Sequence, residues 1–319
     1  MNSLTEDTIT AIILGHAIGD ALGVPVEFCD RSALIQNPVT DFRAFGTHHM
    51  PAGTWSDDTS MTLAAMDSLC HGLDYEDMMR RFCAWEKENA YTATGKVFDM
   101  GISTADALHR CSSGAMALKC GCTGEYDNGN GSLMRILPAV LYCKVRFGNI
   151  PKEESIEVLH NVSALTHAHP RSMIGCGIYG IILDAILDHP DKAAVADGLR
   201  NAKSYYKVHP EYADELKHYS RLFEPHFAEL PPESIGSSGY VVSSLEAAVW
   251  CVLTTNSYPD AVLKAVNLGS DTDTVAAIAG GLAGAIYGID GIPQKWVHGL
   301  LKSTDITDLC KNFYQALSL

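Results

Sequence analysis

The chain has 319 residues, of which 47% are apolar, so it can bury a large core as one domain or as two. Its formal net charge of −15 opposes attachment to nucleic acid or to acidic membrane lipid, because the general field repels phosphate. Ten cysteines lack the paired spacing of a zinc site or a disulfide framework, and reduced, mostly buried thiols are predicted. The N-terminal residues do not resemble a signal peptide, which predicts a cytoplasmic location.

Apolar residues recur mainly at three- and four-residue spacing, and period-two runs are rare and short. This pattern favours an all-α protein. The most apolar stretch, 275–289, falls short of the roughly 20 residues that cross a bilayer, so a buried helix is predicted there rather than a membrane span. The expected helices cover about 5–23, 58–71, 75–89, 97–119, 132–147, 152–164, 170–188, 192–205, 210–223, 240–255, 258–267, 273–288 and 304–317.

Polar and glycine-rich breaks occur at 42–56, 120–131 and 224–239, but none is long enough to mark a domain boundary. A single domain over residues 1–319 is therefore predicted. The loops of this domain hold nearly all of the unusual motifs.

Two acidic clusters, 55–59 (WSDDT) and 269–274 (GSDTDT), each precede a small-residue apolar helix. One such side chain would cap a helix, but two carboxylates with hydroxyls at both places suggest oxygen ligands for hard cations. Converging carboxylates would repel one another unless cations neutralised them, and ligands that are all oxygen favour Mg²⁺ or Mn²⁺ over zinc or copper. On spacing alone, ordinary solvated helix starts remain the alternative.

Five further motifs occur along the chain: 15–28 (GHAIGDALGVPVEF), 98–101 (FDMG), 129–135 (GNGSLMR), 165–167 (LTH) and 239–245 (GYVVSSL). With the two acidic clusters they make seven motifs that resemble, in order and over almost the whole chain, the ADP-ribosylglycohydrolase family. That family includes the dinitrogenase-reductase-activating glycohydrolases and the animal ADP-ribosylhydrolases.

The resemblance implies a compact, single-domain orthogonal helical bundle whose central cleft holds two Mg²⁺ or Mn²⁺ ions. It also implies hydrolysis of a glycosidic bond to ADP-ribose. One position departs mildly from the family, since Ser56 stands where Thr is usual, but the hydroxyl oxygen is retained. By motif matching, the implied ligand set is Ser56, Asp57, Asp58, Asp271, Asp273 and Thr274.

Three carboxylates are implied as catalytic candidates. Glu27 matches a family residue beside the metals, where it would ligate or accept a proton from the attacking water; by itself it reads as a solvated loop residue. Asp99 is the competing acid or base, its alternative being a polar residue on helix 97–119. Asp58 joins them because carboxylates stabilise an oxocarbenium-like transition state. Family members often have a polar side chain three residues after the Asp that matches Asp99, but this chain has Ile102 there. That departure leaves open which ADP-ribosyl linkage is cleaved.

The substrate contacts are implied in the same way. The glycine-rich turn before 133–135 could expose backbone N–H groups to a pyrophosphate, although such turns are mostly structural. Tyr240 is expected near the adenine or else in the core, and Arg135 is expected to pair with a core carboxylate rather than with phosphate. The residues implied to line the ADP-ribose site are Asn130, Gly131, Ser132 and Met134, with His167 on the phosphate side and Tyr240.

The sequence thus predicts a Mg²⁺- or Mn²⁺-dependent hydrolase that removes ADP-ribose from a protein side chain, with arginine preferred. Its expected partner is an ADP-ribosylated protein or a small ADP-ribosyl substrate; no membrane is expected and nucleic acid is disfavoured. Two alternatives stay open. One is hydrolysis of O-acetyl-ADP-ribose, ADP-ribosyl-serine or poly-ADP-ribose, and the other is a non-catalytic ADP-ribose-binding member, which the intact acidic set disfavours.

Overall fold

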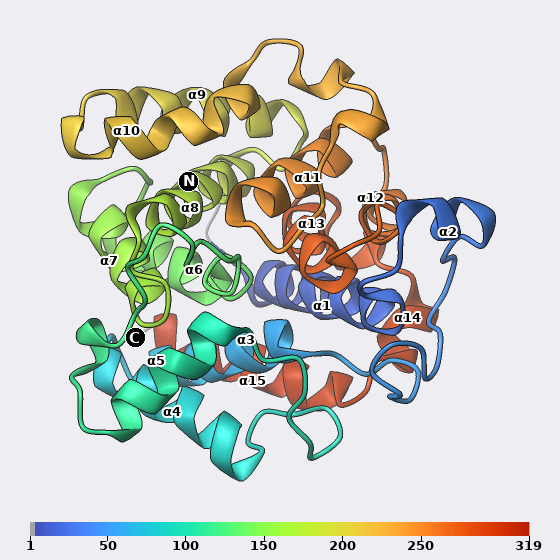
Figure 1. Ribbon diagram of the computed structural model, residues 1–319, viewed down its shortest axis with the longest axis horizontal. Helices are drawn as coiled ribbons and strands as arrows, with labels where there is room; N and C mark the ends of the chain where they lie inside the picture. Colours follow the sequence, from blue (N-terminus) through green and yellow to red (C-terminus); the bar gives the residue numbers. More distant parts are fainter. Residues whose placement is uncertain (1–3, 319) are drawn as a thin grey trace.

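The structure is a computed structural model that describes residues 4–318, and Figure 1 shows these residues as a layered bundle of helices. Within residues 4–318, β-pairing is limited to isolated bridges, such as Gly129 with Tyr240. The predicted all-α class is therefore confirmed. The α-helices are α1 (Glu6–Gly23), α2 (Arg31–Gln36), α3 (Asp57–Leu69), α4 (Tyr75–Glu88), α5 (Ile102–Ser112), α6 (Leu137–Phe147), α7 (Glu153–Ala164), α8 (Pro170–Asp188), α9 (Ala193–Lys207), α10 (Ala213–Leu216), α11 (Val241–Leu253), α12 (Tyr258–Val266), α13 (Thr272–Tyr287), α14 (Gln294–Gly299) and α15 (Ser303–Leu317).

Helices α1 and α13 form the centre of the bundle and pack directly on each other (Figure 1). A Cβ atom on Gly15 would lie 2.6 Å from the carbonyl oxygen of Gly280, and one on Gly19 would lie 2.1 Å from that of Ala276. The two backbones therefore approach more closely than any side chain would allow. This contact positions the C-terminal end of α1 against the N-terminal end of α13.

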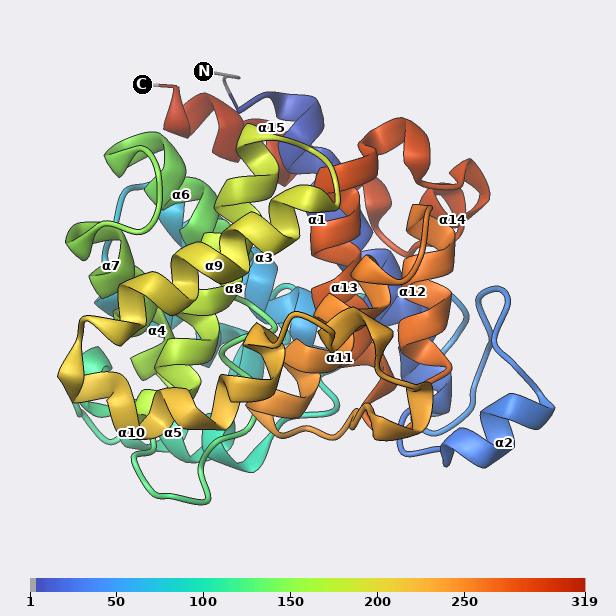
Figure 2. The same cartoon turned by 90° about the horizontal axis from the view of Figure 1, so that it is seen from above.

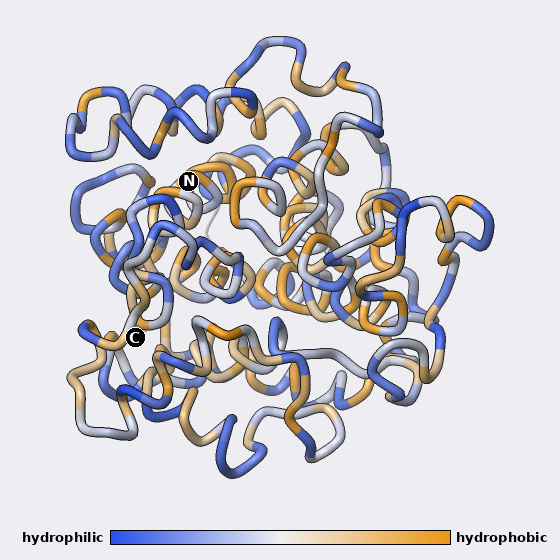
Figure 3. Tube along the Cα trace, in the orientation of Figure 1, coloured by the Kyte–Doolittle hydropathy of each residue, from blue (hydrophilic) through white to orange (hydrophobic). Residues whose placement is uncertain are grey.

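Buried apolar side chains from every α-helix except α10 form one continuous core. Figure 3 shows the apolar residues concentrated on the inner helices, whereas α9 and α10 at the periphery are more polar. Figures 1 and 2 both show α2 and its flanking loops projecting from one side of the bundle. All ten cysteines are free thiols, and six of them are buried, as predicted.

Two helices are long and apolar enough to cross a membrane by length and composition: the segment Glu6–Val26 and α8. The apolar window of the first is entirely buried inside the fold, and 78% of the second is buried. The burial of these two segments is typical of core helices in a globular bundle.

Three predicted helices differ from the structure. The expected helix 97–119 is only α5, because Asp99 has a left-handed φ of +56° and Gly101 is the N-cap. The expected helix 132–147 begins at Leu137, after the glycine-rich turn and with a proline in its first turn. The expected helix 210–223 is broken into short 3₁₀ turns around α10. Two short helices, α2 and α14, were not predicted.

Candidate active site

The two acidic clusters meet at the N-terminal ends of α3 and α13. The Thr274 hydroxyl donates to Oδ2 of Asp58 at 3.3 Å, and the Ser56 hydroxyl donates to the same oxygen at 3.2 Å. Asp58 and Thr274 are separated by 216 residues in the chain. The fold therefore brings together the two clusters that the sequence singled out.

A buried carboxylate on α1 holds the start of α3 in place. Asp20 is fully buried, and its Oδ1 accepts the backbone N–H of Ser56 at 2.9 Å. Its Oδ2 accepts the backbone N–H of Thr59 at 3.0 Å and the Thr59 hydroxyl at 2.6 Å. Asp20 thereby fixes the turn from which Asp57 and Asp58 project. Asp20 was not assigned a role from the sequence. A charged residue inside an otherwise apolar helix does, however, predict a buried carboxylate with hydrogen-bond partners.

The start of α13 is held from two sides. A Cβ atom on Gly23 would lie 2.3 Å from the Cα of Asp273, so only glycine allows α1 to end there. On the other side, the Asn130 side-chain amide donates to Oδ2 of Asp271 at 2.7 Å and to the Ser244 hydroxyl at 2.8 Å. Asp273 thus packs against α1, and Asp271 is held by Asn130 in the turn before α6, which is itself bonded to Ser244 on α11.

Left-handed backbone occurs next to two of the candidate carboxylates and at a third. Phe28, which follows Glu27, has a φ of +63°, and Ser270, which precedes Asp271, has a φ of +65°. Phe28 N–H donates to the Ser270 carbonyl at 2.7 Å, so the two strained residues hold each other. Asp99 itself has a φ of +56°. Each such conformation costs about 1–3 kcal/mol in a non-glycine residue and is typical of functional sites.

These contacts gather carboxylates in a buried space. Oxygens of Glu27, Asp271 and Asp273 lie within 4.8 Å of one another, and all three residues are buried. Burial, followed by the charges of Asp99 and Asp271, raises the pKa of Glu27 to about 11. Burial, followed by the charges of Glu27 and Asp99, raises the pKa of Asp273 well above its ordinary range. The cluster is therefore electrostatically unfavourable unless cations neutralise it.

The same space contains acceptors without donors. Among residues 4–318, Oδ1 of Asp58 and Oδ2 of Asp273 are buried and have no hydrogen-bond partner. Burial, with the charges of Asp20 and Asp57, also raises the pKa of Asp58 well above its usual range. Unpaired carboxylate oxygens in a set of oxygen donors match what Mg²⁺ or Mn²⁺ requires. The residues present therefore fit the divalent cations that the sequence implied.

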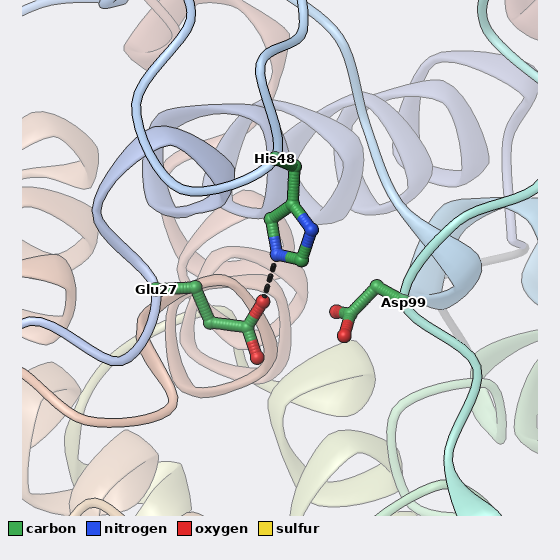
Figure 4. A group of neighbouring side chains, drawn as sticks. All are labelled: Glu27, His48 and Asp99. Carbon is green, nitrogen blue, oxygen red and sulfur yellow. Dashed lines mark hydrogen bonds and ion pairs between the residues drawn. The ribbon is translucent and has the colours of Figure 1, made fainter.

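A second group forms on the outer side of Glu27. Figure 4 shows the carboxylates of Glu27 and Asp99 facing each other, with the ring of His48 between them on one side. His48 Nε2 and Glu27 Oε2 are 2.5 Å apart and share a hydrogen bond. Burial lowers the pKa of His48, although the charge of Asp99 acts in the opposite sense. His48 was not predicted from the sequence, because no spacing pattern links the loop 45–50 to Glu27.

The turn that contains Asn130 and Gly131 lies against His167. A Cβ atom on Gly131 would lie 2.8 Å from Cε1 of that ring, so the missing side chain lets the turn and the imidazole touch. His167 Nδ1 is bonded to the Thr166 hydroxyl at 2.7 Å. Burial, assisted by the charge of Arg135, lowers the pKa of His167 to about 3. The ring is thus neutral and is held in one orientation.

The side chains of Ser132 and Arg135 point into the protein. The Ser132 hydroxyl accepts a hydrogen bond from the Ser163 hydroxyl at 2.8 Å, and Met134 is buried beside it in the chain. Arg135 donates to the carbonyl of Gly131 and to the Thr166 hydroxyl, and its guanidinium lies over the ring of Phe82. The expectation that Arg135 pairs with a core carboxylate was wrong: carbonyls, a hydroxyl and an aromatic face surround it.

Tyr240 borders the turn from the opposite side. It is the N-cap of α11 and pairs with Gly129 in an antiparallel bridge, and Asn130 N–H donates to the Gly239 carbonyl at 3.0 Å. Its half-buried ring has the guanidinium of Arg171 at 5.9 Å from the centroid. Tyr240 therefore lies at the edge of the same turn as Asn130 and is not a core residue.

Comparison with known proteins identifies the class to which this fold and site belong. The ADP-ribosylglycohydrolase family model matches residues 1–319. The chain is 33% identical, over 97% of its length and 78% of the relative's, to the ADP-ribosylarginine hydrolase Tri1 of Pseudomonas putida (strain GB-1). It is 31% identical to the ADP-ribosyl-[dinitrogen reductase] glycohydrolase of Rhodospirillum rubrum, over 92% of this chain and 90% of that one.

A solved structure, titled ADP-ribosylglycohydrolase-related protein complex, superposes with a TM-score of 0.80 at 28% identity and covers 98% of both chains. The chain belongs to the ADP-ribosylglycohydrolase family, as its seven motifs indicated. It is accordingly a hydrolase that acts on ADP-ribosyl linkages.

Proposed function

We propose that this protein is a Mg²⁺- or Mn²⁺-dependent hydrolase that removes ADP-ribose from modified protein side chains, with arginine preferred. The linkage is supported by similarity to a relative named an ADP-ribosylarginine hydrolase. The observation that carries the proposal is the buried meeting of Asp58, Asp271 and Asp273, with two unpaired carboxylate oxygens among them. An intact cluster of this kind also disfavours a non-catalytic role.

The cations would be held by the six oxygen-bearing residues at the heads of α3 and α13. When bound there, they would neutralise the carboxylates and orient the hydroxyls of the ribose next to the scissile bond. The protein contributes the placement of these ligands. Asp20 fixes the α3 set, and Gly23 with Asn130 fixes the α13 set. The proposed ligands are Ser56, Asp57, Asp58, Asp271, Asp273 and Thr274, with Glu27 close enough to join them.

The diphosphate and adenosine would lie along the turn at 128–134. Gly131 leaves the backbone uncovered by a side chain, and the neutral His167 ring beside it would offer an N–H to a phosphate oxygen. Tyr240 presents a half-buried aromatic ring at the far edge of this turn, suited to stacking on a purine. Ser132 and Met134 would support this surface from below, since the Ser132 hydroxyl is bonded inside the protein.

Glu27 and Asp99 are proposed to handle protons on opposite sides of the scissile bond. Glu27 is buried and held by His48, and bound cations would lower its raised pKa so that the carboxylate could accept a proton from the attacking water. Asp99 faces it across the gap and would contact the leaving nitrogen. Asp58 would add negative charge near a transition state of oxocarbenium character.

The natural partner is proposed to be an ADP-ribosylated protein, although a small ADP-ribosyl compound would fit the same groups. A cytoplasmic location stays a prediction, consistent with ten free cysteines.

The test is release of free ADP-ribose from arginine-linked and serine-linked ADP-ribosyl proteins, with Mg²⁺, Mn²⁺ or EDTA. We expect cation-dependent release from the arginine linkage, and a loss of at least about 100-fold in Asp271→Ala because the cation site is broken. Circular dichroism should show that this variant keeps its helices.

Asp290→Ala is the matched control, because this exposed carboxylate follows the opposite end of α13. It should retain full activity. Undiminished release of ADP-ribose in EDTA, or by Asp271→Ala, would contradict the proposal. Release from the serine-linked substrate alone would indicate a hydrolase of ADP-ribosyl-serine instead of ADP-ribosyl-arginine.

A further inference from the structure

Two phenylalanine rings lie next to the His48 ring, beside the proposed catalytic carboxylates. The His48 ring is centred 6.1 Å from the Phe28 ring and 5.1 Å from the Phe98 ring. The same His48 ring lies next to the gap between Glu27 and Asp99, as Figure 4 shows. The contact of His48 with the exposed Phe28 therefore links the reacting carboxylates to the protein surface.

Folding does not explain the exposed ring of this group, Phe28. Its side chain is 67% exposed, so it contributes little to the core, and its φ of +63° is unfavourable for a bulky residue. A small or polar residue would remove the exposed apolar area, and glycine would remove the backbone strain. Phe45 shares both costs, so what distinguishes Phe28 is its ring contact with His48 beside the catalytic carboxylates, where a contact with a ligand would explain the aromatic ring.

Phe28 borders a surface hollow that carries charges of both signs. The hollow has a volume of about 380 Å³, and its lining includes Phe28, Asp30 and Arg31, whose guanidinium donates to three backbone carbonyls. Asp30 is exposed, and Asp99 faces Glu27 beside the His48 ring. A cation that passes from this hollow to the scissile bond would thus start near the Asp30 carboxylate, meet the Phe28 and His48 rings, and reach Asp99.

We propose that Phe28, with His48 and Phe98, receives the planar guanidinium of the departing arginine and so determines which linkage the enzyme cleaves. This inference rests on the proposed function and deepens it by naming a specificity surface. A guanidinium stacks on aromatic faces while its N–H groups reach a carboxylate such as Asp99. A serine hydroxyl has neither the charge nor the plane, so it gains nothing from these rings.

The first test compares Phe28→Leu, which keeps apolar volume, with Phe28→Trp, which keeps an aromatic face. For arginine-linked substrate, kcat/KM should fall about tenfold in Phe28→Leu and stay near the wild-type value in Phe28→Trp. The affinity for ADP-ribose, measured by calorimetry, should change less than about twofold because the ring is proposed to touch only the leaving group.

Phe45→Leu is the matched control. Phe45 is 64% exposed and has a φ of +69°, like Phe28, but the ring contact with His48 belongs to Phe28. This variant should keep wild-type kcat/KM. An unchanged kcat/KM in Phe28→Leu, or an equal loss in Phe45→Leu, overturns the inference.

A second test uses binding alone and so separates this inference from the proposed function. Agmatine carries a planar guanidinium and 1,5-diaminopentane carries ammonium groups; each is titrated into the protein saturated with ADP-ribose. Wild type should bind agmatine more tightly, and Phe28→Leu should lose about tenfold of that affinity while diaminopentane changes little.

If wild type releases no ADP-ribose from arginine yet shows this selectivity for agmatine, the proposed function fails and the aromatic cation surface stands. Equal binding of the two cations by wild type, or binding of neither, overturns the specificity surface whatever the activity.

Discussion

At the scale of single residues, the site buries carboxylate oxygens that the protein itself leaves without a donor. Asp58 and Asp273 each have a buried oxygen without a partner, and burial raises the pKa of both well above the usual range. Removing one of these charges should therefore relieve the protein when no cation is bound. Divalent cations should reverse that balance, because anything that binds only the folded state stabilises it.

We predict that Asp273→Asn separates folding from cation binding. In EDTA its melting temperature should equal or exceed that of wild type, because a buried repulsive charge is gone. With Mg²⁺ at about 100 times its dissociation constant, wild type should gain roughly 5 °C or more, whereas the variant gains almost nothing. Differential scanning calorimetry in the two buffers measures both shifts.

The matched control is Asp184→Asn, which changes a buried carboxylate outside the site. Asp184 lies on α8 with its Oδ1 2.9 Å from the Lys144 ammonium. This variant should keep the full Mg²⁺ shift, whatever its effect on basal stability. If Asp273→Asn also kept the full shift, Asp273 would not be a ligand.

At the scale of elements, the site depends on how α1 and α13 pack. The glycines at 15, 19 and 23 fall every four residues on α1, so they share one face, and that face meets the backbone of α13. The contact determines where Glu27 emerges relative to Asp273. Close backbone packing of two helices thus sets a distance that side chains alone would leave adjustable.

We predict that Gly19→Ala lowers the free energy of unfolding by about 2 kcal/mol or more, because its Cβ would lie 2.1 Å from the Ala276 carbonyl oxygen and neither backbone can move aside easily. Urea titration followed by circular dichroism measures the change. Gly101→Ala serves as the control, because a Cβ at Gly101 meets nothing within 4 Å and its φ of −63° suits alanine. Equal stability of the two variants would show that the helices are not in backbone contact.

At the scale of the whole molecule, ligands from distant parts of the chain meet on one core. The buried apolar residues form one continuous core to which every α-helix except α10 contributes, and the site draws on the ends of α1, α3 and α13. Local unfolding of any of these helices would separate the carboxylates. The site therefore exists only when the whole bundle is folded.

We predict a single cooperative unfolding transition for the Mg²⁺-bound protein, which tests the prediction of one domain over residues 1–319. Calorimetric and van't Hoff enthalpies should agree, and the loss of helix and the loss of tryptophan burial should coincide. Two separated transitions, or a stable proteolytic fragment that retains half of the helices, would indicate two domains.

The sequence was informative wherever a local pattern has one physical cause. The three- and four-residue spacing predicted ten helices to within a few residues, including α1, α8 and α13, because an apolar stripe must face a core. It failed at 97–119, where Val97, Phe98 and Met100 mimic a helical stripe but Asp99 has a left-handed backbone. Backbone strain of this kind is imposed by tertiary contacts and leaves no periodic signal.

The acidic residues were also identified from the sequence, because two carboxylates and hydroxyls at a helix start exceed what capping needs. The roles of their neighbours were less accessible. Asp20 and His48 both touch site residues, but one lies inside an apolar helix and the other in a loop without regular spacing. Arg135 was assigned the wrong kind of partner because a buried guanidinium can be satisfied by carbonyls as well as by a carboxylate.

By itself the sequence determined the helical class, the family and the side chains rich in oxygen ligands, since these follow from residue type and local spacing. Only the tertiary structure decided that Asp58 meets Thr274 across 216 residues, that His48 holds Glu27, and that Phe28 stands exposed beside them. The reason is physical: contacts between distant segments are set by how α1 and α13 pack, and no local pattern records that packing.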